Sequence, residues 1–253
     1  MNESLVSIIT PLYNAEKYIG ETFKSVVAQS YPYWEWIIID DGSTDQSLEF
    51  VKRMSAEESR IKIFQNDSNI GSGKTRNKGI KLATGEMITF IDSDDVWHPE
   101  KLKRHVSFMT NNNILFSHTS YGYIDEVGKK IKGTFHVSKD AVSYYDLLKR
   151  TEISCLTAMY NAKLLGKFYM SEHRRKQDYA LWLSILKTGV KSYGLDEELA
   201  FYRQREGSAT SAKSKLILKH FSFLKETQEM NSIQAIYYTA YWLVNGFIRY
   251  YVK

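Results

Sequence analysis

Two groups of aspartates in this sequence could bind a cation or a phosphate-bearing ligand. Asp40 and Asp41 form one group, residues 92–95 (Asp-Ser-Asp-Asp) form the other, and each group follows an apolar segment. Clustered carboxylates repel one another and raise one another's pKa values unless a cation or hydrogen-bond donors compensate them. A Mg²⁺ or Mn²⁺ ion held by one or two carboxylates together with phosphate oxygens would do so. Alternatively, the aspartates form turns or cap the helix that is expected after Pro99.

The tripeptide Gly73-Lys74-Thr75 matches the end of a nucleotide-binding P-loop. A P-loop also needs a glycine five residues earlier, where the backbone closes around phosphate oxygens, and Ser68 stands there. The surroundings do suit a P-loop, because a strand is expected at 61–65 and a helix at 74–83. A P-loop NTPase is therefore one alternative, and it predicts that Lys74→Ala abolishes ATP binding.

Four short apolar segments, rich in β-branched and aromatic residues, predict strands that are buried on both faces. They span residues 5–10, 34–40, 61–65 and 87–92. A helical pattern connects the first two strands, and another connects the last two, which gives two βαβ units with parallel strands. Ligands bind at the carboxyl ends of strands in such open α/β sheets, and both groups of aspartates lie at strand ends.

The rest of the chain mixes helices and strands. Helices are expected near 100–111 and 143–150, and strands near 114–124 and 131–137. A clearer helix begins at Gln177, because apolar residues repeat at helical spacing up to Gly189, and Asp178 lies in its first turn. From Lys213 on, two more helices are expected.

The composition indicates a globular protein of a reducing compartment. A chain of 253 residues, 43% of them hydrophobic, can bury a sizeable core. Cys155 is the only cysteine and cannot form an internal disulfide, and the first residues lack the pattern of a secretion signal, so we expect the cytoplasm. No run of eighteen apolar residues occurs, so no membrane-spanning helix is expected. The histidines show no repeated ligand spacing, which argues against zinc.

The net charge is +5, from 34 Lys and Arg against 29 Asp and Glu, which suits partners such as nucleic acid, nucleotide phosphates or anionic lipid. A basic nucleic-acid-binding protein is therefore a second alternative, and it predicts an affinity that falls steeply with salt. The acidic strand ends argue against it, because they would repel phosphate without a metal. No nucleic-acid partner is therefore expected.

Five motifs taken together resemble the family 2 glycosyltransferases, which have the GT-A fold. The motifs are VSIITPLYN, WEWIIIDDGSTD, NIGSGKTRNKGIKLATGE, ITFIDSDD and QDYALW, in the order and spacing of the family over roughly residues 5–210. The third motif carries the family's glycine and arginine-asparagine-glycine pattern, filled here by Gly71, Arg76, Asn77 and Gly79. The resemblance therefore explains the segment around Lys74 without a P-loop.

The resemblance implies an α/β fold of the GT-A type, with a Rossmann-like, mostly parallel central sheet flanked by helices and followed by C-terminal helices. It places a glycosyltransferase domain at 1–212, with a nucleotide-sugar-binding half at 1–100 and an acceptor-binding half at 101–212. Residues 213–253 would form a separate helical segment.

The resemblance also implies a nucleotide-sugar site. Pro11 and Tyr13 would line the nucleotide pocket, Asp41 would meet the base and Asp40 would support it, while Arg76 would belong to the same site. A turn with a helix cap is an alternative explanation of Asp40 and Asp41.

Residues 92–94 would be the family's DxD motif, with Ser93 between its two aspartates. Asp94 would coordinate Mn²⁺ or Mg²⁺ directly, and Asp92 would lie toward the ribose and the metal. The metal would neutralise the diphosphate leaving group as a Lewis acid.

Asp178 matches the family's catalytic base, although Gln177 stands where the family normally has a second acid. One base opposite the leaving group predicts a single displacement with inversion at the transferred sugar. The alternative is that Asp178 only caps its helix. Arg203 and Arg205, which alternate on an extended segment, could clamp the diphosphate, or either could lie in a solvated loop.

The last helix combines several tyrosines and Trp242 with Arg249 and Lys253. Such a helix suits the headgroup region of a bilayer, and packing on the core or on a second subunit is the alternative. The resemblance is strongest to bacterial enzymes of O-antigen, capsule or lipooligosaccharide assembly. It implies a nucleotide-diphosphate sugar donor, expected to be a UDP-sugar, and a lipid-linked saccharide acceptor. Contact with the cytoplasmic face of the inner membrane is expected, and a homo-oligomer is left open.

Overall fold

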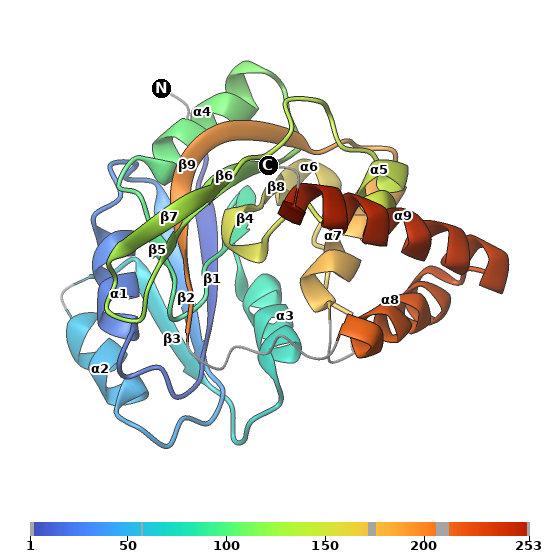
Figure 1. The fold of residues 1–253 in the computed structure, drawn as a ribbon. Coiled ribbons are helices and arrows are strands. Elements are labelled where there is room, and N and C mark those ends of the chain that lie inside the picture. The colour runs from blue at the N-terminus through green and yellow to red at the C-terminus, as the bar shows by residue number, and fades with distance from the viewer. Residues whose placement is uncertain (1–2, 57, 172–175, 206–212, 252–253) are drawn as a thin grey trace.

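A mixed β-sheet runs through the computed structural model, which describes residues 3–56, 58–171, 176–205 and 213–251 (Figure 1). The strand order is β3-β2-β1-β4-β8-β6-β9-β5, and β7 pairs with β6 at one end. The strands are β1 (Val6–Leu12), β2 (Trp34–Asp40), β3 (Ile61–Gln65), β4 (Met87–Phe90), β5 (Val96–Trp97), β6 (Phe116–Ile124), β7 (Lys130–Phe135), β8 (Met159–Asn161) and β9 (Tyr193–Arg203).

Helices cover both faces of this sheet. They are α1 (Ile19–Val27), α2 (Ser47–Met54), α3 (Ser72–Leu82), α4 (Lys101–Asn111), α5 (Tyr144–Lys149), α6 (Ala162–Leu165), α7 (Gln177–Lys187), α8 (Lys213–Gln228) and α9 (Ser232–Tyr251), with a 3₁₀ turn at Cys155–Thr157.

The four strands β3, β2, β1 and β4 are parallel, as the βαβ pattern predicts. All seven residues of β2 and all four of β4 are buried, which explains their nearly continuous apolar sequences. Because β1 lies between β2 and β4, the carboxyl ends of these three strands meet at one edge of the sheet. Tyr13, Asp40 and Asp92 follow or end these strands at that edge.

The alternation of side chains along β1 divides the core between the two faces. Ile8 packs with α1, α2 and α4, through residues such as Phe23 and Val106. Ile9 packs on the other face with α3, α5 and α7, and Trp182 of α7 lies in this second cluster. Phe223 and Leu224 of α8 and Ala235 of α9 join the same cluster, so the C-terminal helices share the core of the main domain.

The second half of the sheet is mixed. β8 is antiparallel to β4 and β6, β9 is parallel to β6, and β5 is antiparallel to β9. Because of the β5–β9 pairing, the end of β9 returns beside the segment that follows β4. Arg203 is therefore brought next to Asp94 and Asp95, which precede it by more than a hundred residues.

In the part of the chain that the structure describes, no helix combines the length and the apolar character that crossing a bilayer requires.

Candidate active site

The acidic segment after β4 meets arginines. Asp92 forms an ion pair with Arg76 of α3, and Asp94 forms one with Arg205, which follows β9. These aspartates do not cap α4, because that helix begins at Lys101 with Glu100 in the N-cap position. The helix-cap alternative is therefore wrong, and the clustered carboxylates are compensated by cations.

Arg76 is the buried cation of the site. Only 8% of the residue is exposed, and its Nη2 contacts Asp92 while its Nε has no hydrogen-bond partner among the described residues. Burial alone would lower the pKa of Arg76, but the charge of Asp92 raises it overall, so the guanidinium stays charged. A buried donor without a partner fits a position where a bound anion would supply the missing acceptor.

Asp95 is buried and accepts a hydrogen bond from the backbone. Its Oδ1 accepts a hydrogen bond of 2.9 Å from the backbone N–H of Arg203. Burial and then the charge of Asp92 raise the pKa of Asp95 well above its ordinary value. Asp95 therefore joins the acidic loop to the end of β9, while Asp92 and Asp94 are the carboxylates left at the surface of the site.

Arg203 lies where it cannot act as the predicted diphosphate clamp. Its side chain is fully buried, and its guanidinium donates to the carbonyl oxygens of Asp94, Asp125 and Glu126 and to the carboxylate of Glu21, at 2.5 to 3.3 Å. Each of its three nitrogens is thus used by the protein. The clamp assignment for Arg203 is wrong, because strand pairing turns this side chain inward to hold the acidic loop.

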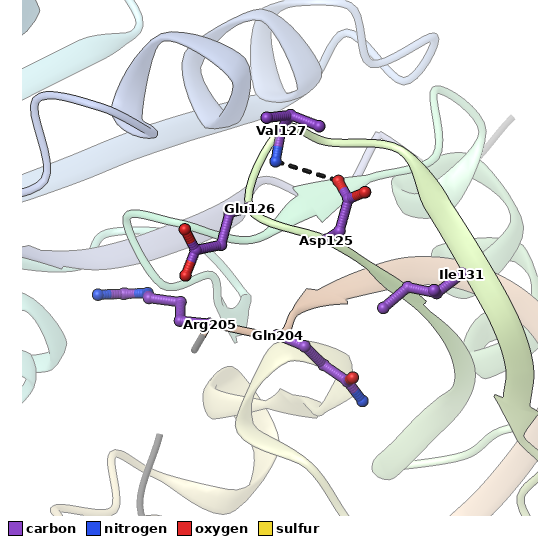
Figure 2. Close-up of a pocket in the computed structure, with 6 residues that line it drawn as sticks. All are labelled: Asp125, Glu126, Val127, Ile131, Gln204 and Arg205. Carbon is purple, nitrogen blue, oxygen red and sulfur yellow. Dashed lines mark hydrogen bonds between the residues drawn. The ribbon is translucent and has the colours of Figure 1, made fainter. Parts of the chain in front are cut away.

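Arg205 lies on the open side of the same strand end. Its side chain is 44% exposed, pairs with Asp94, and places its guanidinium carbon 4.9 Å from the centre of the Tyr18 ring. A cavity of about 400 Å³ adjoins it, and Figure 2 shows the six residues that line it. They are Asp125, Glu126, Val127, Ile131, Gln204 and Arg205. Arg205 therefore stands between the acidic loop and an open cavity.

Asp41 stabilises the loop before α3, which the P-loop alternative assigned to phosphate binding. Its two carboxylate oxygens accept hydrogen bonds of 2.9 Å from the side chain of Asn66 and from the backbone N–H groups of Ile70 and Gly71. A P-loop would need such N–H groups for phosphate, and here they are occupied by a carboxylate. Lys74 is exposed on the first turn of α3. The P-loop alternative is therefore wrong.

The other predicted residues of the nucleotide pocket lie at the same edge. Asp40 is fully buried, and its Oδ2 accepts hydrogen bonds of 3.2 Å from the backbone N–H groups of Gly42 and Ser43, which stabilise the turn after β2. Pro11 lies near the end of β1, and Tyr13 follows it with 47% exposure. Ser93 is 9% exposed between the two DxD aspartates.

Asp178 lies in the first turn of α7, close enough to Arg76 and Asp92 for their charges to act on its pKa. Burial raises the pKa of Asp178, whereas a backbone hydrogen bond from Tyr179 and the charge of Arg76 oppose the rise. The same Arg76 thus acts on both Asp92 and Asp178. A carboxylate whose pKa is raised toward neutral pH suits a general base.

Gly73 explains how α7 comes so close to α3. A Cβ built at Gly73 would lie 2.3 Å from the side chain of Gln177, so only glycine lets that side chain rest on the helix. Since Gln177 precedes Asp178, the approach of α3 helps to place the candidate base. The glycine that suggested a P-loop is thus a packing residue.

Several neighbours of the site were missed at the level of sequence. Glu21 and Tyr18 contact the two arginines, and the buried thiol of Cys155 lies close enough to Arg76 and Asp178 for their charges to influence its pKa, which burial raises. These residues sit in no chemical motif, and their contacts span dozens to well over a hundred residues of sequence. No local signal could have identified them.

A parallel α/β half-sheet with an acidic loop at its strand ends is the arrangement expected of a nucleotide-sugar-dependent transferase of the GT-A fold. The family described as Glycosyl transferase family 2 matches residues 7–169, and the chain belongs to this family. The resemblance inferred from the motifs is thereby confirmed. The protein is a glycosyltransferase, which sets aside the nucleic-acid-binding alternative.

Named relatives extend the match over nearly the whole chain. A Bacillus subtilis (strain 168) protein, "Putative teichuronic acid biosynthesis glycosyltransferase TuaG", is 38% identical over 91% of this chain and 91% of its own. The Escherichia coli UDP-Glc:alpha-D-GlcNAc-diphosphoundecaprenol beta-1,3-glucosyltransferase WfgD is 36% identical over 97% of this chain and 95% of its own. The crystal structure of S. aureus TarS 1-349 with UDP-GlcNAc shares the fold, with a TM-score of 0.70 at 24% identity over 94% of this chain and 71% of that chain.

Proposed function

We propose that this glycosyltransferase moves a sugar from a UDP-sugar to a lipid-linked saccharide, with inversion at the transferred carbon. The observation that carries this proposal is the arrangement of charge at the strand ends. Two partly exposed carboxylates, Asp92 and Asp94, pair with Arg76 and Arg205, and the single candidate base, Asp178, lies close enough to Arg76 and Asp92 for their charges to act on its pKa. One base opposite one leaving group is the arrangement that single displacement needs.

In this reaction an acceptor hydroxyl oxygen attacks the anomeric carbon of the donor. Its proton passes to the carboxylate of Asp178, the bond from the anomeric carbon to the diphosphate oxygen breaks, and the nucleoside diphosphate leaves with that electron pair. Asp178 can take the proton because its carboxylate is ionised above its raised pKa. Arg205 and Arg76 are the cations that would stabilise the leaving diphosphate from the protein's side.

The acidic loop fits a hard divalent cation. Asp92 and Asp94 offer only carboxylate oxygens, the ligand type that Mg²⁺ and Mn²⁺ prefer. Across the described residues there is no group of three or more His, Cys, Asp or Glu that could hold a metal. We propose an ion bound by one or two of these carboxylates and completed by the donor's phosphates. When bound, such an ion supplies Lewis-acid stabilisation of the diphosphate.

The choice of donor and acceptor rests on the relatives. WfgD is named for UDP-glucose and for an N-acetylglucosamine linked through diphosphate to undecaprenol. Because this chain matches that protein over almost its full length, we extend the same chemical classes to it. The assembly of a bacterial surface polysaccharide such as O-antigen, capsule or lipooligosaccharide would use such a reaction, on the cytoplasmic face of the inner membrane.

The outer face of α9 supports peripheral contact with an anionic bilayer. Its inner face touches the protein through Ala235, Thr239, Trp242 and Asn245. Its outer face carries exposed apolar residues at helical spacing, namely Ile233, Ile236, Tyr237, Tyr241, Val244, Phe247 and Ile248. Residues 213–253 contain six Lys or Arg against two Glu, a balance that suits anionic headgroups.

A transfer assay tests the proposal. UDP-glucose and a short-chain GlcNAc-diphosphate lipid are incubated with the protein and Mn²⁺, and the new anomeric proton is observed by NMR. We expect UDP release and a β-linked product from the α-linked donor, and loss of turnover with retained UDP binding in Asp178→Asn. Full turnover by Asp178→Ala, or an α-linked product, would refute the assignment of the base.

A further inference from the structure

Lys176, two residues before Asp178, is enclosed by rings from three helices. Its Nζ lies 4.5 Å from the centre of the Trp242 ring of α9, 5.8 Å from that of Phe223 of α8 and 5.6 Å from that of Tyr179 of α7. Figure 1 shows α8 and α9 packed beside α7. An ammonium group over aromatic faces is attracted by their quadrupoles, and the attraction grows when water is excluded.

His220 of α8 connects the lysine to α9. Its Nδ1 accepts a hydrogen bond of 2.5 Å from Lys176 Nζ, and its ring stacks on Trp242 at 4.3 Å between centres. Trp242 in turn donates from Nε1 to the Thr151 hydroxyl at 2.9 Å. Burial and then the charge of Lys176 lower the pKa of His220 to about 3, so the imidazole is neutral and can accept this hydrogen bond.

The backbone of Lys176 is in the left-handed region, with φ 53° and ψ 36°. Residues other than glycine rarely adopt this conformation, so surrounding contacts must hold it. The carbonyl oxygen of Lys176 accepts the first hydrogen bond of α7, from Ala180 at 2.9 Å. The turn at Lys176 therefore fixes the direction in which α7 starts, and with it the place of Asp178.

The ammonium of Lys176 is occupied by groups of the protein. This ammonium is used by His220 and the rings, and burial lowers its pKa to about 8 while the nearby charge of Asp178 opposes that shift. A lysine held in this way can orient the helix without exchanging a proton with substrate.

We propose that Lys176 is a positioning residue for the catalytic base, held in place by His220 and Trp242 of the C-terminal helices. This inference rests on the proposed role of Asp178. It makes α8 and α9 part of the catalytic apparatus, because they fix the turn from which the base projects.

The test compares Lys176→Met and Lys176→Arg with His220→Phe, which keeps a ring against Trp242 but removes the acceptor. The control is Lys187→Met, at the far end of the same helix, where the lysine is exposed and lies over Tyr144. For each variant we would measure kcat and KM with UDP-glucose, UDP affinity by calorimetry, thermal stability, and amide hydrogen exchange over residues 177–187.

In Lys176→Met and His220→Phe we expect kcat to fall by about tenfold or more, with UDP affinity within about twofold of wild type. Lys176→Arg should recover part of the loss, and Lys187→Met should behave as wild type. Amides of the first turn of α7 should exchange faster in the two impaired variants. Unchanged kcat and unchanged exchange in both would overturn the proposal. If the wild type transfers no sugar, the proposed function fails, while the exchange data still decide whether Lys176 holds the turn.

Discussion

Arg203 and Arg205 have different roles because Arg203 is the last residue of β9, whereas Arg205 lies beyond the end of the strand. Side chains two residues apart in a strand point to the same face, so the sequence pattern could not separate the two arginines. Which one faces inward depends on the pairing of β9 with β5 and β6, which joins residues far apart in sequence. The strand-end aspartates, Arg76 and Arg205 could be named as site candidates because they lie in local motifs, whereas the pairing of each aspartate with its arginine and the Lys176 contacts could not be predicted.

Replacing Arg203 should separate its structural role from that of Arg205. Arg203→Met leaves three backbone carbonyl oxygens and Glu21 without their donor, so we expect a loss of about 2–4 kcal/mol in the free energy of unfolding. Urea denaturation measures this loss. Arg205→Met is the matched control, and it should weaken UDP binding with little loss of stability, because its side chain is partly exposed. Equal stability of the two variants would contradict the assignment.

The raised pKa of Asp178 predicts the acidic limb of the pH profile. Burial favours the protonated acid, so the carboxylate is lost as pH falls through a pKa above that of an ordinary aspartate. As the pH falls, we therefore expect kcat to decline at a higher pH than it would if the base were an exposed aspartate. UDP affinity, measured in parallel by calorimetry, should show a different pH dependence. A kcat that is constant down to the ordinary pKa of aspartate would argue against Asp178 as the base.

At the scale of the elements, helices and strands were predicted correctly where apolar residues repeat regularly along the sequence. The parallel strands and α3, α4 and α7 were expected close to their observed bounds, because buried strands and helix stripes leave regular patterns. β5, β8 and α6 have two to four residues each, too few for any period to show. α2 was missed because half of its eight residues are polar and only Ser47 and Val51 are buried.

The contact between α3 and α7 gives a test at this scale. Gly73→Ala would push a methyl group into the side chain of Gln177, which is flexible, so the stability cost should stay below about 1 kcal/mol. Displacement of Gln177 beside Asp178 should nevertheless lower kcat severalfold. Adding Gln177→Ala should make room for the new methyl group and restore part of the turnover. Lys74→Ala, on the exposed side of α3, should leave both unchanged. An additive effect of Gly73→Ala and Gln177→Ala would show that the two residues are not coupled.

For the whole molecule, the two faces of α9 have different roles. The inner face packs against the protein core, and the outer face is the proposed membrane contact. The inner face belongs to the core that α7 also enters, so the helix cannot leave without exposing that core. The outer face is mostly exposed, with Lys149 of α5 lying 5.5 Å from the centre of the Tyr241 ring at its border. The sequence predicted an aromatic, basic helix here, and it left lipid, core and second subunit open because periodicity alone does not show which face is covered.

Charged substitutions on the outer face of α9 test the proposed membrane contact. Ile236→Glu together with Val244→Glu should reduce co-sedimentation with phosphatidylglycerol vesicles by about tenfold or more, with no change in thermal stability, because both residues are more than half exposed. Leu164→Glu, equally exposed on α6, is the control. Vesicle binding by the wild type that does not depend on anionic lipid would contradict the proposed contact. So would a wild-type dimer, seen by analytical sedimentation, that these substitutions convert to a monomer, because the outer face would then bind a second copy of the chain.

The most direct test of the central claim is a calorimetric titration of UDP, GDP, CDP, dTDP and ATP, each with Mn²⁺, with Mg²⁺ and with chelator. It would be made on wild type, Asp94→Ala and Lys74→Ala. We predict that a nucleoside diphosphate, UDP, binds in the presence of metal, that Asp94→Ala loses this binding, and that Lys74→Ala keeps it. Metal-dependent ATP binding that survives Asp94→Ala and is lost in Lys74→Ala would contradict the assignment of the strand-end acids as the nucleotide-sugar site.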